Sequence, residues 1–177
     1  MNSRLALILS LVASAALMRL VPHPPNFTPV AALALFAGAH LANRLWAFAV
    51  PLAAMALSDL ALQVLYGYGW HSTLWAVYLS FAAVVAVGLT LQSRRRPGPV
   101  AAAAVASSLL FFVVTNFAVW ADGLLYPRTG AGLAACFVAA IPFYAWTLAG
   151  DLFYTAVLFG LFAAMEKRLT GPAPQPV

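Results

Sequence analysis

Charged residues are scarce in this chain. Of its 177 residues only 7% are Asp, Glu, Lys or Arg, whereas 64% are hydrophobic, and the mean hydropathy is +0.94. A soluble domain carries roughly 25% charged residues to cover its surface. The shortage excludes cytosolic enzymes, nucleic-acid readers and disordered proteins. We therefore expect an all-α integral membrane protein, with the lipid bilayer as its main partner and no nucleic acid.

Cysteine is almost absent too. The single cysteine, Cys136, excludes a disulfide framework within the chain and a multi-cysteine zinc site. The sequence also lacks a His-Glu-x-x-His helix, a Gly-x-Ser-x-Gly elbow and a glycine-rich phosphate loop. Asp59 and Asp151 could imitate the paired aspartates of intramembrane proteases, but neither follows Gly-x-Gly. The sequence predicts that the protein is not an enzyme and has no intrinsic cofactor.

The sequence contains several long apolar runs. A bilayer core of about 30 Å needs roughly 20 apolar helical residues per crossing. We expect six crossings, over residues 5–21, 29–42, 45–65, 73–91, 100–120 and 142–164. The second is short, and Pro142 is expected to break residues 131–141 from the sixth crossing. The predicted architecture is one transmembrane domain over residues 1–168, followed by a disordered tail over 169–177.

Two of these helices carry start signals. Thr28 before Pro29 predicts an N-cap followed by proline at the first helical position, and Ser72 is expected to cap the fourth helix.

The cationic residues predict the orientation. Six crossings place both termini on one side, and seven of the nine cationic residues then share that side, while Arg19 and Arg128 lie opposite. By the positive-inside rule the side with seven faces the cytoplasm, so both termini are cytoplasmic. The seven are Arg4, Arg44, Arg94, Arg95, Arg96, Lys167 and Arg168.

Polar residues at membrane depth indicate a site. At about 1.5 Å per residue, Asp59 and Asp151 lie on the order of 10 and 13 Å below the outer helix ends. A charge at mid-bilayer costs at least about 2.5 to 3.5 kcal/mol, so we expect each of the two aspartates to have a functional role. With the outer loops they form a one-sided cluster, which suits a binding pocket better than a channel. The predicted ligand-binding residues are His23, Asn26, Asp59, Trp70, Tyr78, Asn116, Asp122, Arg128 and Asp151.

The same residues have structural alternatives. Asp59 and Asp151 could instead cap or bridge helices, for example by pairing with Arg19 or Arg128. Thr147 and Asn116 suit hydrogen bonds between helices.

A stripe of small residues marks the first helix. Ala6, Ser10 and Ser14 repeat every four residues, a spacing that lets another helix approach closely. The stripe either packs inside this protein or docks another membrane subunit.

The link between the first two helices carries a resemblance. Pro24-x-Asn26-Phe27-Thr28-Pro29, followed by an alanine-rich run over 31–39, resembles the substrate-binding S-components of energy-coupling factor vitamin transporters. The resemblance covers about residues 1–168 and is nearest to the solitary cobalamin-specific S-components. It implies a multi-pass protein of the bacterial inner (cytoplasmic) membrane that captures a vitamin-like molecule from outside, with cobalamin or a related corrinoid favoured. It also implies an ATP-driven energy-coupling module as a possible partner on the stripe of Ala6, Ser10 and Ser14.

The cobalamin group further implies a metal ligand. There, a loop residue after the third helix, typically cysteine, donates an axial ligand to cobalt. This chain has Trp70-His71-Ser72 in that loop, so His71 is the expected axial ligand, because imidazole binds first-row transition metals. The alternative functions are a structural or assembly membrane protein without a ligand and, third, an intramembrane enzyme.

Overall fold

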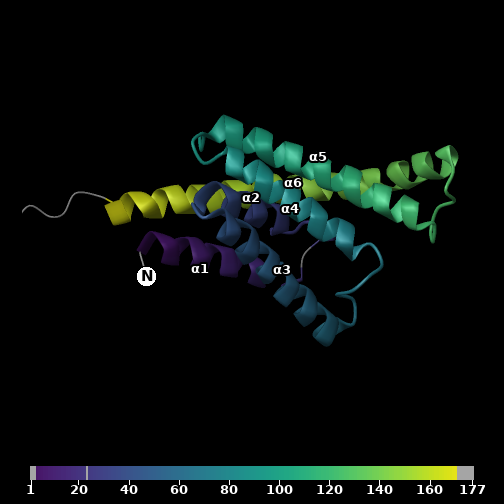
Figure 1. The fold of residues 1–177 in the computed structure, drawn as a ribbon, viewed down its shortest axis with the longest axis horizontal. Helices are drawn as coiled ribbons and strands as arrows, with labels where there is room; N and C mark the ends of the chain where they lie inside the picture. The colour runs from purple at the N-terminus through teal and green to yellow at the C-terminus, as the bar shows by residue number, and fades with distance from the viewer. Residues whose placement is uncertain (1–2, 23, 171–177) are drawn as a thin grey trace, which may run out of the picture.

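The computed structural model describes residues 3–22 and 24–170. His23 and residues 171–177 of the predicted tail lie outside the described residues. The described chain forms six helices, which confirms the predicted all-α fold (Figure 1). They are α1 (Ser3–Met18), α2 (Val30–His40), α3 (Arg44–Tyr66), α4 (Leu74–Thr90), α5 (Pro97–Asp122) and α6 (Gly130–Thr170).

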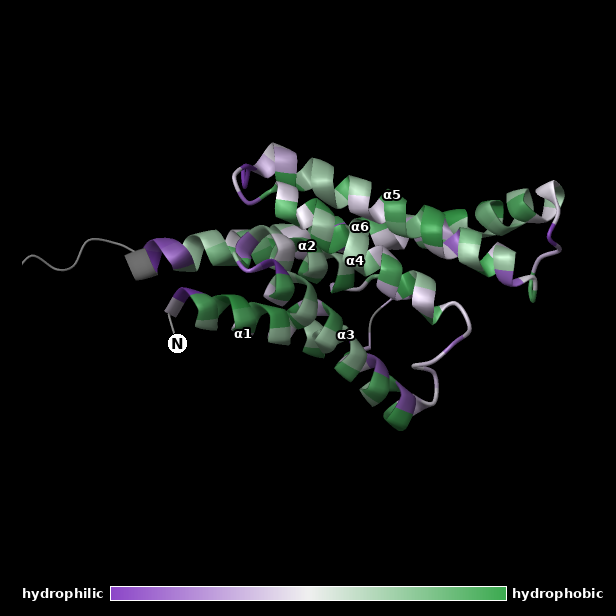
Figure 2. Ribbon diagram, in the orientation of Figure 1, coloured by the Kyte–Doolittle hydropathy of each residue, from purple (hydrophilic) through white to green (hydrophobic). Residues whose placement is uncertain are grey.

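Three helices are long and apolar enough to cross a membrane. These are α3, α5 and the part of α6 over Gly130–Arg168, of 23, 26 and 39 residues. The other three are apolar but shorter, with 16 residues in α1, 11 in α2 and 17 in α4. Most hydrophilic stretches lie in the links and near helix ends, and the middle of the bundle is hydrophobic (Figure 2).

The short helix α2 is the centre of the bundle. All 11 of its residues are buried, and it contacts each of the other five helices. Its closest neighbour is α4, because both helices have glycine where they cross. A Cβ on Gly38 would lie 2.4 Å from the Val85 carbonyl oxygen, and one on Gly88 would lie 2.4 Å from that of Leu35. The two backbones touch because neither residue has a side chain there.

The predicted break of the last apolar stretch at Pro142 is wrong. The structure has one continuous helix of 41 residues with Pro142 inside it. Proline removes one backbone hydrogen bond, but packing on both sides of it holds the helix together. The ring of Phe112 on α5 contacts Phe137 before the proline, with centroids 5.5 Å apart, and Tyr144 after it, at 4.8 Å.

Both predicted helix caps are wrong. Helix α2 has Pro29 rather than Thr28 at its N-cap, one residue later than expected. Helix α4 has Thr73 at its N-cap, and no side chain caps it. The Ser72 hydroxyl instead donates to the Oδ2 of Asp122, at 2.5 Å. A bond to the end of α5 therefore replaces the local cap.

The links and helix ends divide between two ends of the molecule. At one end, which we call the basic end, lie the first turn of α1, the α2–α3 and α4–α5 links and the last turns of α6 (Figure 1). Arg4 and Glu166 pair there at 2.7 Å, and the Gln92 amide donates to the carbonyls of Gly38 and Leu41. The seven cationic residues predicted to share a side all lie at this end. The α1–α2, α3–α4 and α5–α6 links lie toward the other, which we call the opposite end.

Candidate functional site

Several of the predicted site residues line a polar hollow where the α1–α2 link meets α5 and α6. It consists of two adjoining cavities of about 200 and 60 Å³, which share Asn26, Phe111 and Thr147 in their walls. Asn116 lines the larger cavity and Asp151 the smaller one. We call the two together the link cavity. The structure thus brings three predicted residues, Asn26, Asn116 and Asp151, to one place.

Asn26 is held there by its backbone and by the residue after it. Its φ is +64°, in the left-handed region where asparagine is among the better tolerated residues. The ring of Phe27 packs among Trp146, Phe153 and Tyr154 of α6, with centroids 5.4 to 6.4 Å apart. This aromatic cluster anchors the link, while Asn26 itself stays exposed at the cavity.

Asp151 is the buried charge-bearing group of this cavity. Its side chain accepts a hydrogen bond from the Ser108 hydroxyl, and the residue is only 3% exposed. Within the described part of the chain it pairs with neither Arg19 nor Arg128, but its bond to Ser108 bridges α6 to α5, as the structural alternative predicts. A carboxylate has about four acceptor positions, and one hydrogen bond leaves most of them open. Asp151 can therefore receive N–H or cationic groups from a molecule in the cavity.

The amide and hydroxyl groups of the cavity bond within their own helices. Asn116 Nδ2 donates to the Phe112 carbonyl at 2.8 Å, and Thr147 Oγ1 donates to that of Phe143 at 3.1 Å. The prediction that these two side chains bond between helices is therefore wrong. The Asn116 amide has a second N–H and a carbonyl oxygen to offer a ligand, whereas the Thr147 hydroxyl, whose proton is already used, can only accept. Phe111 and aromatic neighbours on α5 and α6 form the apolar walls.

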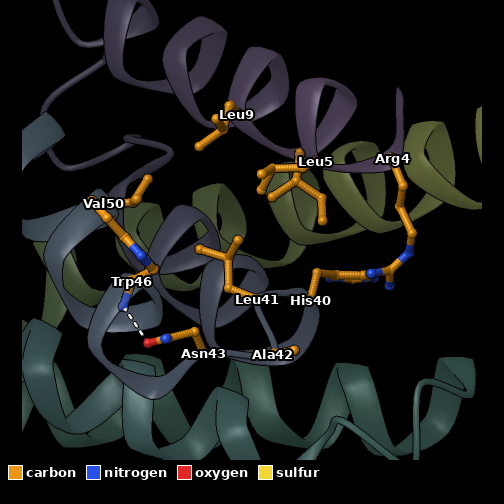
Figure 3. A pocket seen from close by; sticks show the side chains of 10 residues that line it. Arg4, Leu5, Leu9, His40, Leu41, Ala42, Asn43, Trp46 and Val50 are labelled. Atoms are coloured by element: carbon orange, nitrogen blue, oxygen red, sulfur yellow. Dashed lines mark hydrogen bonds between the residues drawn. The ribbon is translucent and has the colours of Figure 1, made fainter. Parts of the chain in front are cut away.

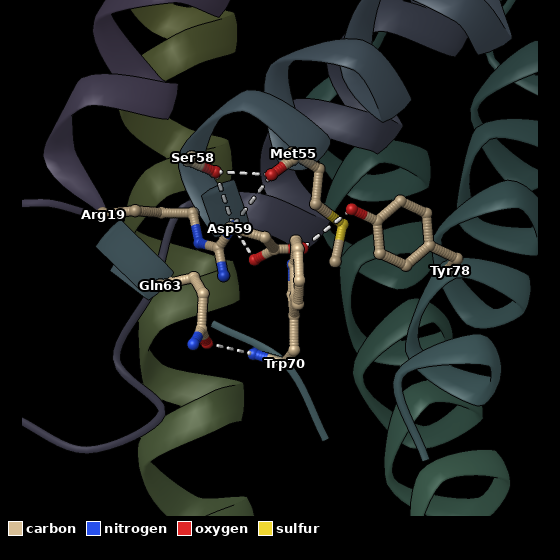
Figure 4. A network of polar contacts seen from close by, with 7 residues as sticks. All are labelled: Arg19, Met55, Ser58, Asp59, Gln63, Trp70 and Tyr78. Carbon is tan, nitrogen blue, oxygen red and sulfur yellow. Dashed lines mark hydrogen bonds and ion pairs between the residues drawn. The ribbon is translucent and has the colours of Figure 1, made fainter. Parts of the chain in front are cut away.

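Asp59 belongs to a second cluster, between α1, α3 and α4. Its Oδ1 lies 2.7 Å from Arg19 Nη1, and the Tyr78 hydroxyl donates to its Oδ2 at 2.8 Å (Figure 4). Arg19 also donates to Ser58 Oγ at 2.5 Å and to the Met55 carbonyl at 3.4 Å. These contacts satisfy both charges, so the ion-pair alternative is confirmed for Asp59. Neither Asp59 nor Tyr78 lines the link cavity.

The remaining predicted residues lie on exposed links. Arg128 is exposed and donates to the backbone carbonyl of Asp122 at 3.0 Å. Trp70 is exposed, and its backbone N–H donates to Gln63. His71 is exposed as well, with Nδ1 at 3.1 Å from Thr73 Oγ1. The described residues hold no group of three or more side chains suited to bind a metal ion.

Sequence reasoning missed the group that holds Asp151. Ser108 ends a run of mostly small residues over 101–108, and such a run by itself indicates only close helix packing. Its hydroxyl became a specific partner because α5 and α6 run antiparallel side by side (Figure 1). The hydrophobic pattern of a helix does not show which other helix it packs against. The contact between Ser108 and Asp151 therefore could not be predicted from the sequence.

A second pocket lies at the basic end and was not predicted. It has a volume of about 400 Å³ and lies between α1, the α2–α3 link and α3 (Figure 3). Arg4, His40 and Trp46 line it together with aliphatic side chains. The His40 ring packs in a tilted arrangement against the rings of Phe36 and Phe162, with centroids 4.3 Å apart in both cases. Arg4 is bound to Glu166 at 2.7 Å, and His40 Nδ1 lies 3.1 Å from the Phe36 carbonyl oxygen.

Comparison with known families gives one match. The sequence profile of a family of unknown function, DUF6580, matches residues 1–174. The chain belongs to the DUF6580 family. Comparison with curated proteins and with solved structures finds no match in either set. Membership of DUF6580 names no activity, so the resemblance to S-components stays a prediction.

Proposed function

We propose that this protein is a membrane-embedded binding protein of the S-component kind, which captures a small vitamin-like molecule without transforming it. In this proposal all six helices belong to a six-crossing bundle in the bacterial inner membrane. The basic end faces the cytoplasm, as the positive-inside rule predicts. The link cavity then opens toward the outer side, where exposed Asn26 meets water.

The buried carboxylate of Asp151 is the observation that carries the proposal. A charge-bearing group in the apolar part of a membrane protein is costly unless it is paired. Asp59 is fully engaged with Arg19 and Tyr78, whereas Asp151 has Ser108 alone among the described residues and lines a cavity. A ligand that donates N–H groups or brings positive charge would satisfy it.

The cavity also constrains the size of the ligand. Pockets for drug-sized molecules measure roughly 300 to 1,000 Å³, and the two parts of the link cavity measure about 200 and 60 Å³. A heterocyclic vitamin is of a suitable size, and aromatic walls suit a flat ring. A corrinoid is far larger, so cobalamin would require the α1–α2 and α3–α4 links to move apart. We therefore favour a small nitrogen heterocycle over cobalamin.

An energy-coupling partner is compatible with the first helix. Ser10 and Ser14 are exposed and Ala6 is half-buried, so the alternative in which this stripe packs inside the protein is wrong. The exposed stripe supports the proposed docking of a second membrane subunit. If no ligand is found, the same stripe favours the structural or assembly function.

Ligand capture can be tested on gently purified protein. Native mass spectrometry detects a retained small molecule, and thermal shifts across a panel of heterocyclic vitamins and cobalamin identify its class. Asp151→Asn keeps the side-chain volume but removes the charge, and should weaken binding at least about tenfold, because a hydrogen bond to a charged group contributes about 1.5 to 3 kcal/mol.

Asp122→Asn is the matched control, because Asp122 lies outside the link cavity and should leave binding unchanged. The absence of any retained molecule and of any thermal shift, in wild type as in the variants, would favour the assembly function. Equal affinity in wild type and Asp151→Asn would remove the link cavity as the site.

A further inference from the structure

A long apolar groove lies between α5 and α6 near the basic end, away from the link cavity. Its volume is about 490 Å³, within the range of pockets that hold whole ligands. The groove exists because α6 presents small residues to it, among them Ala156, Gly160 and Ala163. A Cβ built on Gly160 meets nothing within 4 Å. We call this feature the α5–α6 groove.

The mouth of the groove is strongly basic. Arg95 lines it beside Pro97, and Arg94 and Arg96 flank Arg95 in the sequence. None of the three arginines forms an ion pair with a described residue, and the nearby Glu166 already binds Arg4. Partial burial lowers the pKa of Arg95, and the positive charge of Arg4 lowers it further, while Glu166 raises it. An anion at the mouth would stabilise this arginine run.

The floor of the groove contains an unsatisfied hydroxyl. Thr155 is 3% exposed and lines the groove, and its Oγ1 has no hydrogen-bond partner among the described residues. A buried hydroxyl without a partner is destabilising.

We propose that the α5–α6 groove binds an anionic phospholipid, with one acyl chain along the apolar floor and the phosphate against Arg95 and its neighbours. The charge of the mouth selects an anionic over a zwitterionic headgroup, because basic pockets between transmembrane helices bind such headgroups. Arginine suits this role since its guanidinium forms paired hydrogen bonds to phosphate oxygens. The inference does not depend on the proposed ligand of the link cavity.

The test compares lipid retention in nanodiscs made from a mixture of phosphatidylglycerol and phosphatidylcholine. After extraction, native mass spectrometry should show one retained phosphatidylglycerol per protein and little phosphatidylcholine. Arg95→Gln should weaken retention about fivefold, the contribution expected of one arginine near anionic lipid. Gly160→Leu fills the floor and should abolish retention.

Two matched variants serve as controls. Arg44→Gln removes a charge from the same end outside the groove, and Gly130→Leu makes the same substitution at the far end of α6, where a Cβ also meets nothing. Both should retain the lipid. Equal retention of the two lipids by the wild type would overturn the proposal, as would unchanged phosphatidylglycerol retention in both Arg95→Gln and Gly160→Leu. If Gly160→Leu does not fold, Arg95→Gln decides alone.

Discussion

Arg19, directly after α1, and Asp59 in α3 form a buried ion pair, with Nη1 and Oδ1 at 2.7 Å and side chains only 16% and 5% exposed. The pair joins the α1–α2 link to α3, and Tyr78 extends it to α4 through its bond to Asp59. Three segments far apart in the sequence are thus fixed by one carboxylate. This contact explains why a charge is present on α3 without any need for a ligand.

Breaking this pair from one side should destabilise the protein strongly. Arg19→Gln leaves the carboxylate of Asp59 without its cationic partner, and losing one member of a buried pair costs about 3 to 5 kcal/mol. We expect a clearly lower melting temperature in detergent, whereas the exposed Arg128→Gln should melt like the wild type. Tyr78→Phe should have a smaller effect, of about 1.5 to 3 kcal/mol, because one hydrogen bond to the carboxylate is lost. If Arg19→Gln melts with the wild type, the pair is not a stabilising contact.

The crossing of α2 and α4 should tolerate no added side chain. Gly88→Ala would place a methyl group 2.4 Å from a backbone carbonyl, so the two helices must move apart. We expect a large fall in the yield of folded protein on size-exclusion chromatography. Gly160→Ala makes the same substitution where a Cβ meets nothing, and should stabilise α6 by up to about 1 kcal/mol through helix propensity. Similar yields for the two variants would contradict the close crossing.

Cobalamin should not bind saturably, because the link cavity is too small for a corrin ring. His71 provides the check, since its Nε2 is the nitrogen left for cobalt while Nδ1 contacts Thr73. Titration of cobalamin followed by absorption spectroscopy should give no spectral shift in either wild type or His71→Ala. A saturable shift that is at least about tenfold weaker in His71→Ala would reverse the prediction, because loss of an axial ligand costs more than loss of one ordinary hydrogen bond.

Topology reporters can test the six crossings. A reporter fused after Lys167 should report the cytoplasm, and one inserted in residues 68–71 should report the outer side. The two positions lie at the basic and opposite ends of the bundle. Reports from the same side would show that the shorter helices do not complete six crossings.

The candidate site was only partly predictable, because sequence gives depth along a helix more readily than direction around it. Counting residues placed Asp59 and Asp151 at similar depths below the outer helix ends. The structure brings Asn116 and Asp151 to the link cavity but turns Asp59 toward Arg19. Rise per residue is a local property, whereas the direction a side chain takes depends on which helices are neighbours.

The sequence by itself determined the helical class, the membrane-like composition and the gathering of seven cations at one end, because run length and charge order are local quantities. Only the tertiary structure decided that α2 is fully buried, that α6 continues through Pro142 and that Ser108 meets Asp151. Each of these depends on a partner distant in sequence: Gly88 for α2, Phe112 for the two sides of Pro142, and α5 against α6 for Asp151. Packing between helices selects such partners, and a single helical pattern does not encode them.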